Sequence, residues 1–254
     1  MGTLDKAEKT LGRMQYHIRC KPGDVGDFVL LPGDPGRVPR IAKYLDAPQE
    51  IANHREYMTY TGQHQGIRVS ATSTGIGCPS ASIAVEELAN IGATSFIRVG
   101  STGALQEGMH IGDLVIATGS MKGEGTSRFY VPDRLPAVPD FNLTRCLIDA
   151  AAELAPRLGF QYHVGLVASD DAFYGESPRY IRKLHDLRLL SVEMEASAIF
   201  TICHVRGLRG AMIAAVSGNL HTGEVIYEEE NTALIQGWEH EIQVVLRAIE
   251  LAAR

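Results

Sequence analysis

Short apolar runs alternate with amphipathic stretches along nearly the whole chain. Most of the runs are rich in Val, Ile, Leu and Ala without polar alternation, which is typical of strands that are buried on both faces. We predict strands at 28–31, 57–61, 67–73, 94–100, 113–117, 164–168 and 212–216. Between these runs apolar residues recur at helical spacing. We predict helices at 38–45, 80–91, 140–157, 193–206 and about 229–252.

The alternation of strands and helices predicts an α/β fold with a mainly parallel sheet flanked by helices. The chain shows no linker and no internal repeat, so residues 1–254 are expected to form a single domain. Residues 1–13 are polar, and we expect them to be flexible. Residues 119–139 contain several glycines and prolines and predict a long loop, which in a compact domain usually serves function or assembly.

Composition narrows the function further. The 254 residues are 45% hydrophobic and 21% charged, and 24 basic against 30 acidic side chains give a net charge of −6. Lys and Arg form no stripe and no apolar run is long enough to cross a bilayer, so we expect no nucleic-acid and no membrane partner. The four cysteines are far apart and the polar N-terminus lacks the apolar core of a signal peptide. These features predict a cytoplasmic protein with free thiols.

The stretch from 96 to 104, FIRVGSTGA, combines one arginine, two hydroxyl side chains and two glycines. A buried strand ends there in glycines and hydroxyls, and ligands of α/β sheets bind at the carboxyl ends of strands. Glycines allow close approach of the backbone, and Arg98 offers a planar fork that matches phosphate. An ordinary turn with a surface arginine is an equally good interpretation of this stretch taken alone.

A second glycine turn, PGDPGR at 32–37, follows the strand at 28–31 and precedes a helix. Strand, glycine turn and helix together present backbone N–H groups to an anion. Two prolines and an aspartate also make a plain tight turn, so this motif is weak by itself.

Four segments taken together resemble the hexameric nucleoside phosphorylase family (NP-I type). They are PGDPGR at 32–37, STGIG at 73–77, RVGSTG at 98–103 and EME at 193–195, and their order and spacing match over nearly the whole chain. Within the family the chain looks most like the uridine phosphorylases, through the stretches at 54–56, 80–88 and 129–141. The resemblance implies a single-domain, three-layer α/β/α fold with a central mixed, mainly parallel sheet.

The resemblance also implies a reaction. Phosphate, as co-substrate, attacks C1′ of a nucleoside and releases a free base and ribose 1-phosphate, with no other cofactor required. The implied catalytic residues are Arg98 and Glu195. The implied phosphate ligands are Gly33, Arg37, Arg98, Ser101 and Thr102, together with Arg55 from a neighbouring subunit. We therefore expect a homo-oligomer, with a hexamer built as a trimer of dimers as the family's state.

The implied ribose site consists of Met194 and Glu195, with His17 lent by a neighbouring subunit to the 5′ hydroxyl. A carboxylate that accepts two hydroxyl donors would bind more strongly as the sugar ring gains positive charge. Two other interpretations stay open: Glu193 and Glu195 could merely favour a helix N-terminus, and His17 could be a plain surface histidine.

The implied base site departs from the uridine phosphorylase pattern. Its expected residues are Gly103, Phe173, Glu176, Ser177, Arg179 and Glu193. Uridine phosphorylases use a glutamine where this chain has Glu176 or Ser177. An amide both donates and accepts hydrogen bonds, whereas an ionised glutamate only accepts and favours a base edge rich in N–H groups. Gly218 stands where purine phosphorylases carry an acidic residue, which weakens the purine interpretation.

Uridine phosphorylases also bind a monovalent cation at a dimer interface, and Glu56, Val69 and Ser73 match the ligands, so we expect a structural K⁺ site there.

Two alternative functions remain. The chain could be a purine nucleoside phosphorylase with a rearranged acid, or a non-catalytic nucleoside-binding protein with an altered base pocket.

Overall fold

The computed structural model describes residues 11–225 and 231–253. Its strands are β1 (Phe28–Leu31), β2 (Asp46–His54), β3 (Tyr57–His64), β4 (Ile67–Thr72), β5 (Ser95–Ala104), β6 (Leu114–Gly123), β7 (Tyr162–Asp170), β8 (Ser191–Glu193), β9 (Arg209–Asn219) and β10 (Glu224–Val225). Its helices are α2 (Val38–Ala42), α3 (Cys78–Asn90), α4 (Phe141–Leu158), α5 (Pro178–Asp186), α6 (Ala196–Arg206) and α7 (Thr232–Ala252). Short 3-10 turns are η1 (Pro35–Arg37), η2 (Ser127–Phe129) and η3 (Phe173–Gly175). None of the described helices combines the length and the apolar character that a bilayer-crossing segment requires.

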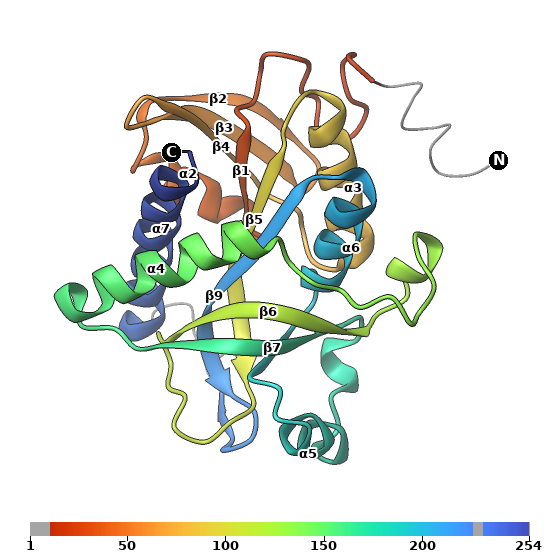
Figure 1. Cartoon of the computed structure of the whole chain (residues 1–254), viewed down its shortest axis with the longest axis vertical. Helices are drawn as coiled ribbons and strands as arrows, with labels where there is room; N and C mark the ends of the chain where they lie inside the picture. Colours follow the sequence, from red (N-terminus) through yellow and green to blue (C-terminus); the bar gives the residue numbers. More distant parts are fainter. Residues whose placement is uncertain (1–10, 226–230, 254) are drawn as a thin grey trace.

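The strands form one mixed sheet in the order β10-β9-β6-β7-β8-β5-β1-β4-β3-β2. β9 pairs with β5 as well as with β6, so the strands β5, β9, β6, β7 and β8 close into a ring. The remaining strands β1 to β4 extend from β5 as an open arm (Figure 1). Among the described pairings, antiparallel ones are as frequent as parallel ones. The mixed sheet is thus confirmed, with more antiparallel pairing than strand–helix alternation suggests.

Side chains alternate between the two faces of the central strands. On β5, Phe96 packs into the core cluster shared with α3 and α6, while Ile97 and Val99 pack into the cluster shared with α4 and α7. On β9, Met212 and Ile213 divide between the same two clusters. Both faces are therefore apolar, which explains the continuous hydrophobic runs in the sequence. The three-layer arrangement is confirmed, with α3 and α6 together on one side and α4 and α7 in contact on the other (Figure 1).

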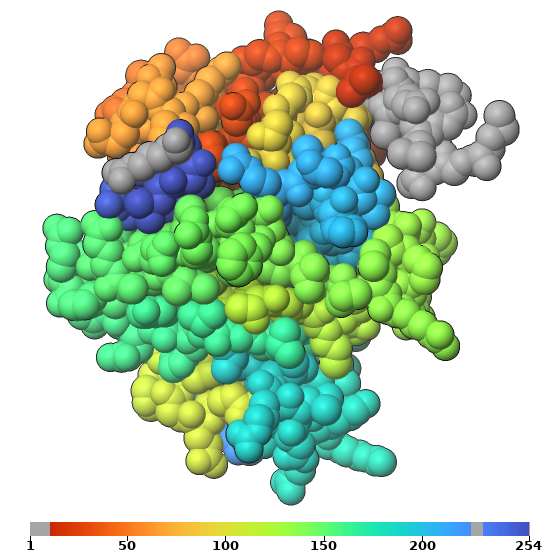
Figure 2. All heavy atoms as spheres, viewed as in Figure 1, coloured from red at the N-terminus to blue at the C-terminus, as the bar shows by residue number. Residues whose placement is uncertain are grey.

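The space-filling view shows the outer layer directly. Residues of α4 and of α6 are both visible on this side of the molecule, and the segment that contains η2 projects beside them (Figure 2). This segment belongs to the region 119–139 that was predicted as a loop. The prediction fails for residues 119–123, because β6 continues to Gly123, and the rest of the region contains only the short turn η2.

The sequence pattern missed four elements: β2, β8, β10 and α5. β2 has no apolar alternation and contains Pro48, which is tolerated there because β2 is the edge strand of the sheet. α5 is short and strongly polar, and of its residues only Ile181 and Leu184 are buried. Residues 1–10 of the segment expected to be flexible, and the predicted helix start at 229, lie outside the described residues.

The topology brings the two glycine turns to one place. β1 and β5 are parallel neighbours, and Leu31 pairs with Arg98, so the turn after β1 lies beside the middle of β5; the segment 98–103, expected to form a turn, continues this strand to Ala104. The segment after β4 joins the same edge, because the amide of Gly75 donates to the carbonyl of Gly33 at 2.9 Å. Parallel strands thus collect at one edge the motifs that the sequence separates.

Helix α7 approaches the sheet closely at Gly237. A Cβ at this position would lie 2.8 Å from Cα and 2.9 Å from the carbonyl oxygen of Gly112. We expect Gly237→Ala to lower the free energy of unfolding by about 1–2 kcal/mol, because overpacking against backbone outweighs the gain in helix propensity. Denaturant unfolding would measure this loss. Gln236→Ala, at an exposed position of the same helix, should change stability by less than about 0.5 kcal/mol. Equal stability of the two variants would contradict the close contact.

Candidate functional site

The turn after β1 places a buried arginine at the edge of the sheet. Asp34 caps η1 by accepting the amide of Gly36 at 2.9 Å, which fixes the path of the chain into α2. Arg37, the last residue of η1, is 7% exposed, and its guanidinium lies 4.7 Å from the ring centroid of Trp238 on α7. A buried guanidinium requires an anionic partner, and Glu241 of α7 provides it at 2.7 Å.

The middle of β5 brings Arg98 and Ser101 to the same place. A Cβ on Gly100 would lie 2.9 Å from the Arg98 guanidinium, so only glycine lets this side chain fold over its own strand. The amide of Gly100 donates to Glu241 at 2.6 Å. The hydroxyl of Ser101 accepts the indole N–H of Trp238 at 3.1 Å. Helix α7 therefore contacts both the turn after β1 and the middle of β5.

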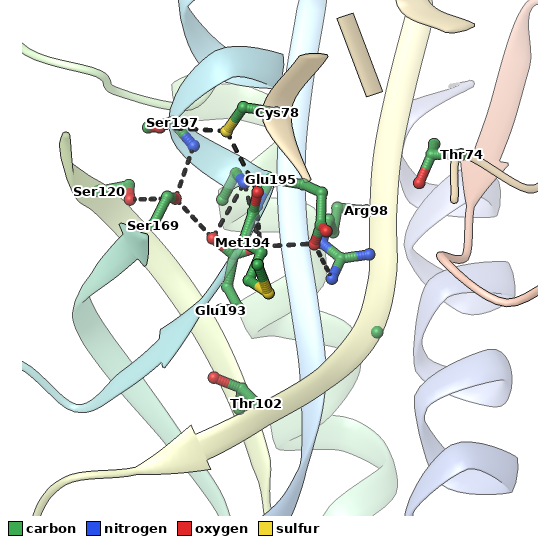
Figure 3. Close-up of polar contacts among 12 residues, drawn as sticks. Thr74, Cys78, Arg98, Thr102, Ser120, Ser169, Glu193, Met194, Glu195 and Ser197 are labelled. Atoms are coloured by element: carbon green, nitrogen blue, oxygen red, sulfur yellow. Dashed lines mark hydrogen bonds and ion pairs between the residues drawn. The ribbon is translucent and has the colours of Figure 1, made fainter. Parts of the chain in front are cut away.

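Arg98 is the centre of a buried cluster of charges. Its Nε donates to Glu193 at 2.9 Å, and its Nη2 pairs with Glu195 (Figure 3). Its Nη1 is buried and has no hydrogen-bond partner among the described residues, and it lies on the side of Gly33. A guanidinium nitrogen that is buried without a partner indicates a place where a ligand oxygen can accept a hydrogen bond from it.

Glu193 and Glu195 have different tasks. Glu193 accepts the amides of Glu195 and Ala196 at the start of α6 and the hydroxyl of Ser169 at 2.5 Å (Figure 3). The helix-terminus interpretation left open by the sequence therefore describes Glu193. Glu195 accepts the amide of Gly77 at 2.6 Å and faces Arg98. Burial raises the pKa of Glu195, and Arg98 partly offsets this effect.

A cavity of about 590 Å³ opens beside this cluster. Its volume suits a small organic ligand. It is lined by Gly33, Asp34, Arg37, Ile76, Arg98, Gly100, Ser101, Thr102, Gly103, Phe173, Tyr174, Glu176, Val192, Glu193, Met194, Glu195, Ser217, Gly218, Leu220 and Trp238. The guanidiniums of Arg37 and Arg98 lie at one part of the cavity, each paired with carboxylates, and aromatic and acidic side chains lie where the loop after β7 forms the lining.

Most of the residues predicted for the site are brought together here. The cavity lining includes the predicted phosphate ligands Gly33, Arg37, Arg98, Ser101 and Thr102, the ribose residues Met194 and Glu195, and the base residues Gly103, Phe173, Glu176 and Glu193. Thr102 differs from the expectation in its bonding, because its hydroxyl proton is donated to the carbonyl of Val192 at 2.8 Å. That proton holds β8 against β5 and is not free for a phosphate oxygen.

In the loop after β7, only one of three candidates lines the cavity. Glu176 does so, whereas Ser177 caps α5 by accepting the amide of Tyr180, and Arg179 is exposed on α5. Burial and the nearby Asp170 together raise the pKa of Glu176 to about 7. Asp170 itself is 6% exposed and accepts the hydroxyl of Tyr180 at 2.9 Å. At neutral pH, Glu176 therefore populates both its protonated and its ionised form.

His17 and Arg55, the residues expected to act across a subunit boundary, lie outside the cavity of their own chain. His17 Nδ1 contacts Glu87 at 2.6 Å. Arg55 is exposed at the turn between β2 and β3, with a φ of 58°, and forms no ion pair with a described residue. Neither side chain belongs to the lining of this cavity.

The structure corrects the proposed cation ligands. Val69 is wholly buried in β4 opposite Gly62, which lies six residues after Glu56. At roughly 3.3 Å per residue Val69 is about 20 Å from Glu56, too far for one ion to touch both. The hydroxyl of Ser73 donates to the backbone carbonyl of Glu56 at 2.6 Å, and the carboxylate of Glu56 accepts from Ser80 at 2.9 Å. The set of Glu56, Val69 and Ser73 is wrong as a single site.

The sequence analysis missed the contribution of α7. Trp238 lines the cavity and Glu241 lies fully buried behind it. Burial raises the pKa of Glu241 to about 7, and Arg37 opposes this shift. A glutamate among the apolar positions of an amphipathic helix is an available signal, but its partners come from segments more than 140 positions away in the chain.

Comparison with known proteins agrees with this geometry. The profile of the Phosphorylase superfamily matches residues 27–250, and the chain belongs to this superfamily. A uridine phosphorylase of Thermococcus kodakarensis is 50% identical over 224 residues, which cover 83% of this chain and 79% of that protein. A guanosine phosphorylase of Halorubrum lacusprofundi is 45% identical over 209 residues, 82% of this chain and 85% of that protein. The crystal structure of a uridine phosphorylase from Vibrio fischeri superposes with a TM-score of 0.85 at 34% identity, covering 93% of this chain and 97% of that chain.

The electrostatics of the loop after β7 can be tested without a ligand. Asp170→Asn removes a negative charge that helps to raise the pKa of Glu176, so we expect the Glu176 carboxyl to titrate at lower pH, closer to its ordinary value. NMR titration of ¹³C-labelled glutamate side chains would measure the shift. Asp186→Asn, at the far end of α5, serves as the control and should leave the titration of Glu176 in place. An unchanged titration in Asp170→Asn would contradict the coupling.

Proposed function

We propose that the protein catalyses the phosphate-dependent cleavage of a nucleoside into free base and ribose 1-phosphate. The observation that carries the proposal is the unpartnered Nη1 of Arg98, which is buried at the cavity edge beside Gly33. Phosphate at this place would accept from Arg98, Arg37 and Ser101, three donors that surround a dianion. Glu195 pairs with Arg98 and lines the same cavity together with Met194, which supports a ribose site adjoining the phosphate site.

The proposed reaction follows from this order of sites. A phosphate oxygen forms a bond to C1′ as the bond from C1′ to the base nitrogen breaks, and the electron pair of that bond leaves with the base. The sugar gains positive charge in the transition state. Glu195, once it accepts the ribose hydroxyls, would place a carboxylate near that charge and stabilise it. Holding phosphate and nucleoside together in one cavity also lowers the entropic cost of bringing the two reactants into the reactive geometry.

The charge balance supports a contribution from a second subunit. The guanidiniums of Arg37 and Arg98 face the carboxylates of Glu193, Glu195 and Glu241. Among the described residues of this cluster the acidic groups thus outnumber the basic ones, which opposes the entry of a phosphate dianion. Arg55, exposed and without an ion pair, could supply the missing positive charge to a neighbouring cavity in a homo-oligomer. We retain the hexamer as the expected assembly.

Uridine is the first candidate substrate, because uridine phosphorylases are among the relatives of this chain. Uracil presents an N–H donor beside a carbonyl acceptor. A protonated carboxyl group both accepts and donates, so protonated Glu176 can serve the edge that a glutamine would serve. The raised pKa of Glu176 supports a substantial protonated fraction near pH 7.

Guanosine is the second candidate, and the same side chain favours it. Guanine presents adjacent N–H donors, which an ionised carboxylate accepts with both oxygens. A relative that is 45% identical is a guanosine phosphorylase. Gly218 lines the cavity, so the lining offers no acid at the position used by purine phosphorylases, and this observation ranks guanosine second.

The decisive experiment is release of free base from uridine and from guanosine, each with and without phosphate. We expect release from uridine that requires phosphate and yields ribose 1-phosphate in equal amount. Separation of base and nucleoside by chromatography measures the rate. Release that proceeds equally well without phosphate would indicate hydrolysis, and no release from either nucleoside would favour the nucleoside-binding alternative.

The role of Glu176 is tested by Glu176→Gln. An amide cannot ionise, so we expect kcat/KM for uridine to fall less steeply between pH 6 and 8 than in the wild type, whose profile also contains the titration of Glu176. At pH 8 the kcat/KM of the variant should exceed the wild-type value by about tenfold. Ionised Glu176 in the wild type would face a carbonyl acceptor of uracil, and this unmatched contact costs about 1.4 kcal/mol or more. The rate with guanosine should fall. Ser177→Ala is the matched control, and equal pH profiles for wild type and Glu176→Gln would contradict the assignment.

A further inference from the structure

Helix α7 presents two side chains, three positions apart, to the cationic end of the cavity. Trp238 lines the cavity, and Glu241 lies behind it with no exposed surface. Residues at this spacing share one face of a helix. Their partners, Arg37, Gly100 and Ser101, belong to the two segments that the proposed function assigns to phosphate.

Trp238 determines how Ser101 uses its hydroxyl. The indole nitrogen can only donate, so at 3.1 Å the oxygen of Ser101 must be the acceptor. The hydroxyl proton of Ser101 therefore stays available for another acceptor. Phosphate as a dianion offers only acceptors, so this arrangement suits it. The ring of Trp238 also lies against the guanidinium of Arg37.

Glu241 uses each of its two oxygens once. One accepts from Arg37 Nη2 at 2.7 Å and the other accepts the amide of Gly100 at 2.6 Å. An amide side chain has a single acceptor oxygen and could satisfy only one of these donors. The carboxylate thus joins the turn after β1 to the middle of β5 at a fixed separation.

We propose that Trp238 and Glu241 are positioning residues of the phosphate subsite: α7 holds Arg37, Ser101 and the backbone at Gly100 in one donor array before phosphate arrives. This inference rests on the proposed function, because it takes phosphate as the ligand. Donors that are already oriented cost little reorganisation when the ligand binds, and affinity rises accordingly. Glu241 acts through Arg37 and the backbone of Gly100 and does not touch the ligand.

The test uses inorganic phosphate as the probe and the full chain as the protein. Glu241→Gln leaves either Arg37 or Gly100 facing a donor, so we expect the phosphate Kd by titration calorimetry, and the phosphate KM, to rise by about ten- to a hundredfold. The KM for nucleoside should change by less than about twofold, since the ribose and base residues do not contact Glu241. A merely structural role would impair both substrates together.

Trp238→Phe is the second variant. It keeps an aromatic ring beside Arg37 and removes the N–H that Ser101 accepts, so we expect about a three- to tenfold rise in phosphate Kd. Its conservative change keeps the test decisive if Glu241→Gln fails to fold. Glu250→Gln, which alters contacts with Arg247 and His64 at the other end of α7, should leave phosphate affinity unchanged.

A double-mutant cycle with Arg37→Ala separates positioning from a general loss of structure. If Glu241 acts through Arg37, the substitution Glu241→Gln should add little to the phosphate Kd in the Arg37→Ala background. Fully additive effects, or a wild-type phosphate Kd in folded Glu241→Gln and Trp238→Phe proteins, would overturn the inference. Wild-type protein that binds no phosphate would instead overturn the proposed function itself.

Discussion

The guanidinium of Arg98, buried against Glu193 and Glu195, is the contact on which the arrangement of the site depends. It ties the middle of β5 to the end of β8 and to the short segment that follows β8. Glu193 extends the same network to the first amides of α6 and to Ser169 of β7. Loss of one partner from such a buried ion cluster costs about 3–5 kcal/mol, because the remaining charge is left without compensation. The fold and the site therefore share their central interaction.

A second ion pair, between Arg37 and Glu241, repeats this design at the other side of the cavity edge. Burial raises the pKa of Glu195 and of Glu241, since water no longer stabilises their charges. The guanidiniums in the cavity therefore already have ion-pair partners. The carboxyl groups of Glu195 and Glu241 have pKa values above their ordinary range. Both proposed roles, phosphate binding at one end and adaptable base recognition by Glu176 at the other, follow from charge placed where solvent is excluded.

Local pattern carried much of the fold and many of the site residues. The apolar runs of β1, β5 and β9 identified central strands, because burial on both faces demands uninterrupted hydrophobic sequence. The glycine turns identified Gly33, Arg37, Arg98 and Ser101. The sequence pattern did not predict elements that bury few apolar side chains. β2 is an exposed edge strand, and α5 buries only two side chains. Val69 was misassigned, since matching positions in a motif says nothing of the distance along a strand.

By itself the sequence determined which chemical groups are available and which segments carry them: the apolar strands of a buried core, two glycine-rich segments with arginines, and an EME segment. Taken together, these segments indicate a phosphorylase. Only the tertiary structure decided how those groups are paired. It showed that Glu176, not Ser177 or Arg179, lines the cavity and that Trp238 and Glu241 of α7 hold the opposite end. The reason is physical: strand and helix patterns follow from local burial and spacing, whereas hydrogen bonds and ion pairs between distant segments arise only when the packed sheet brings them within a few ångströms.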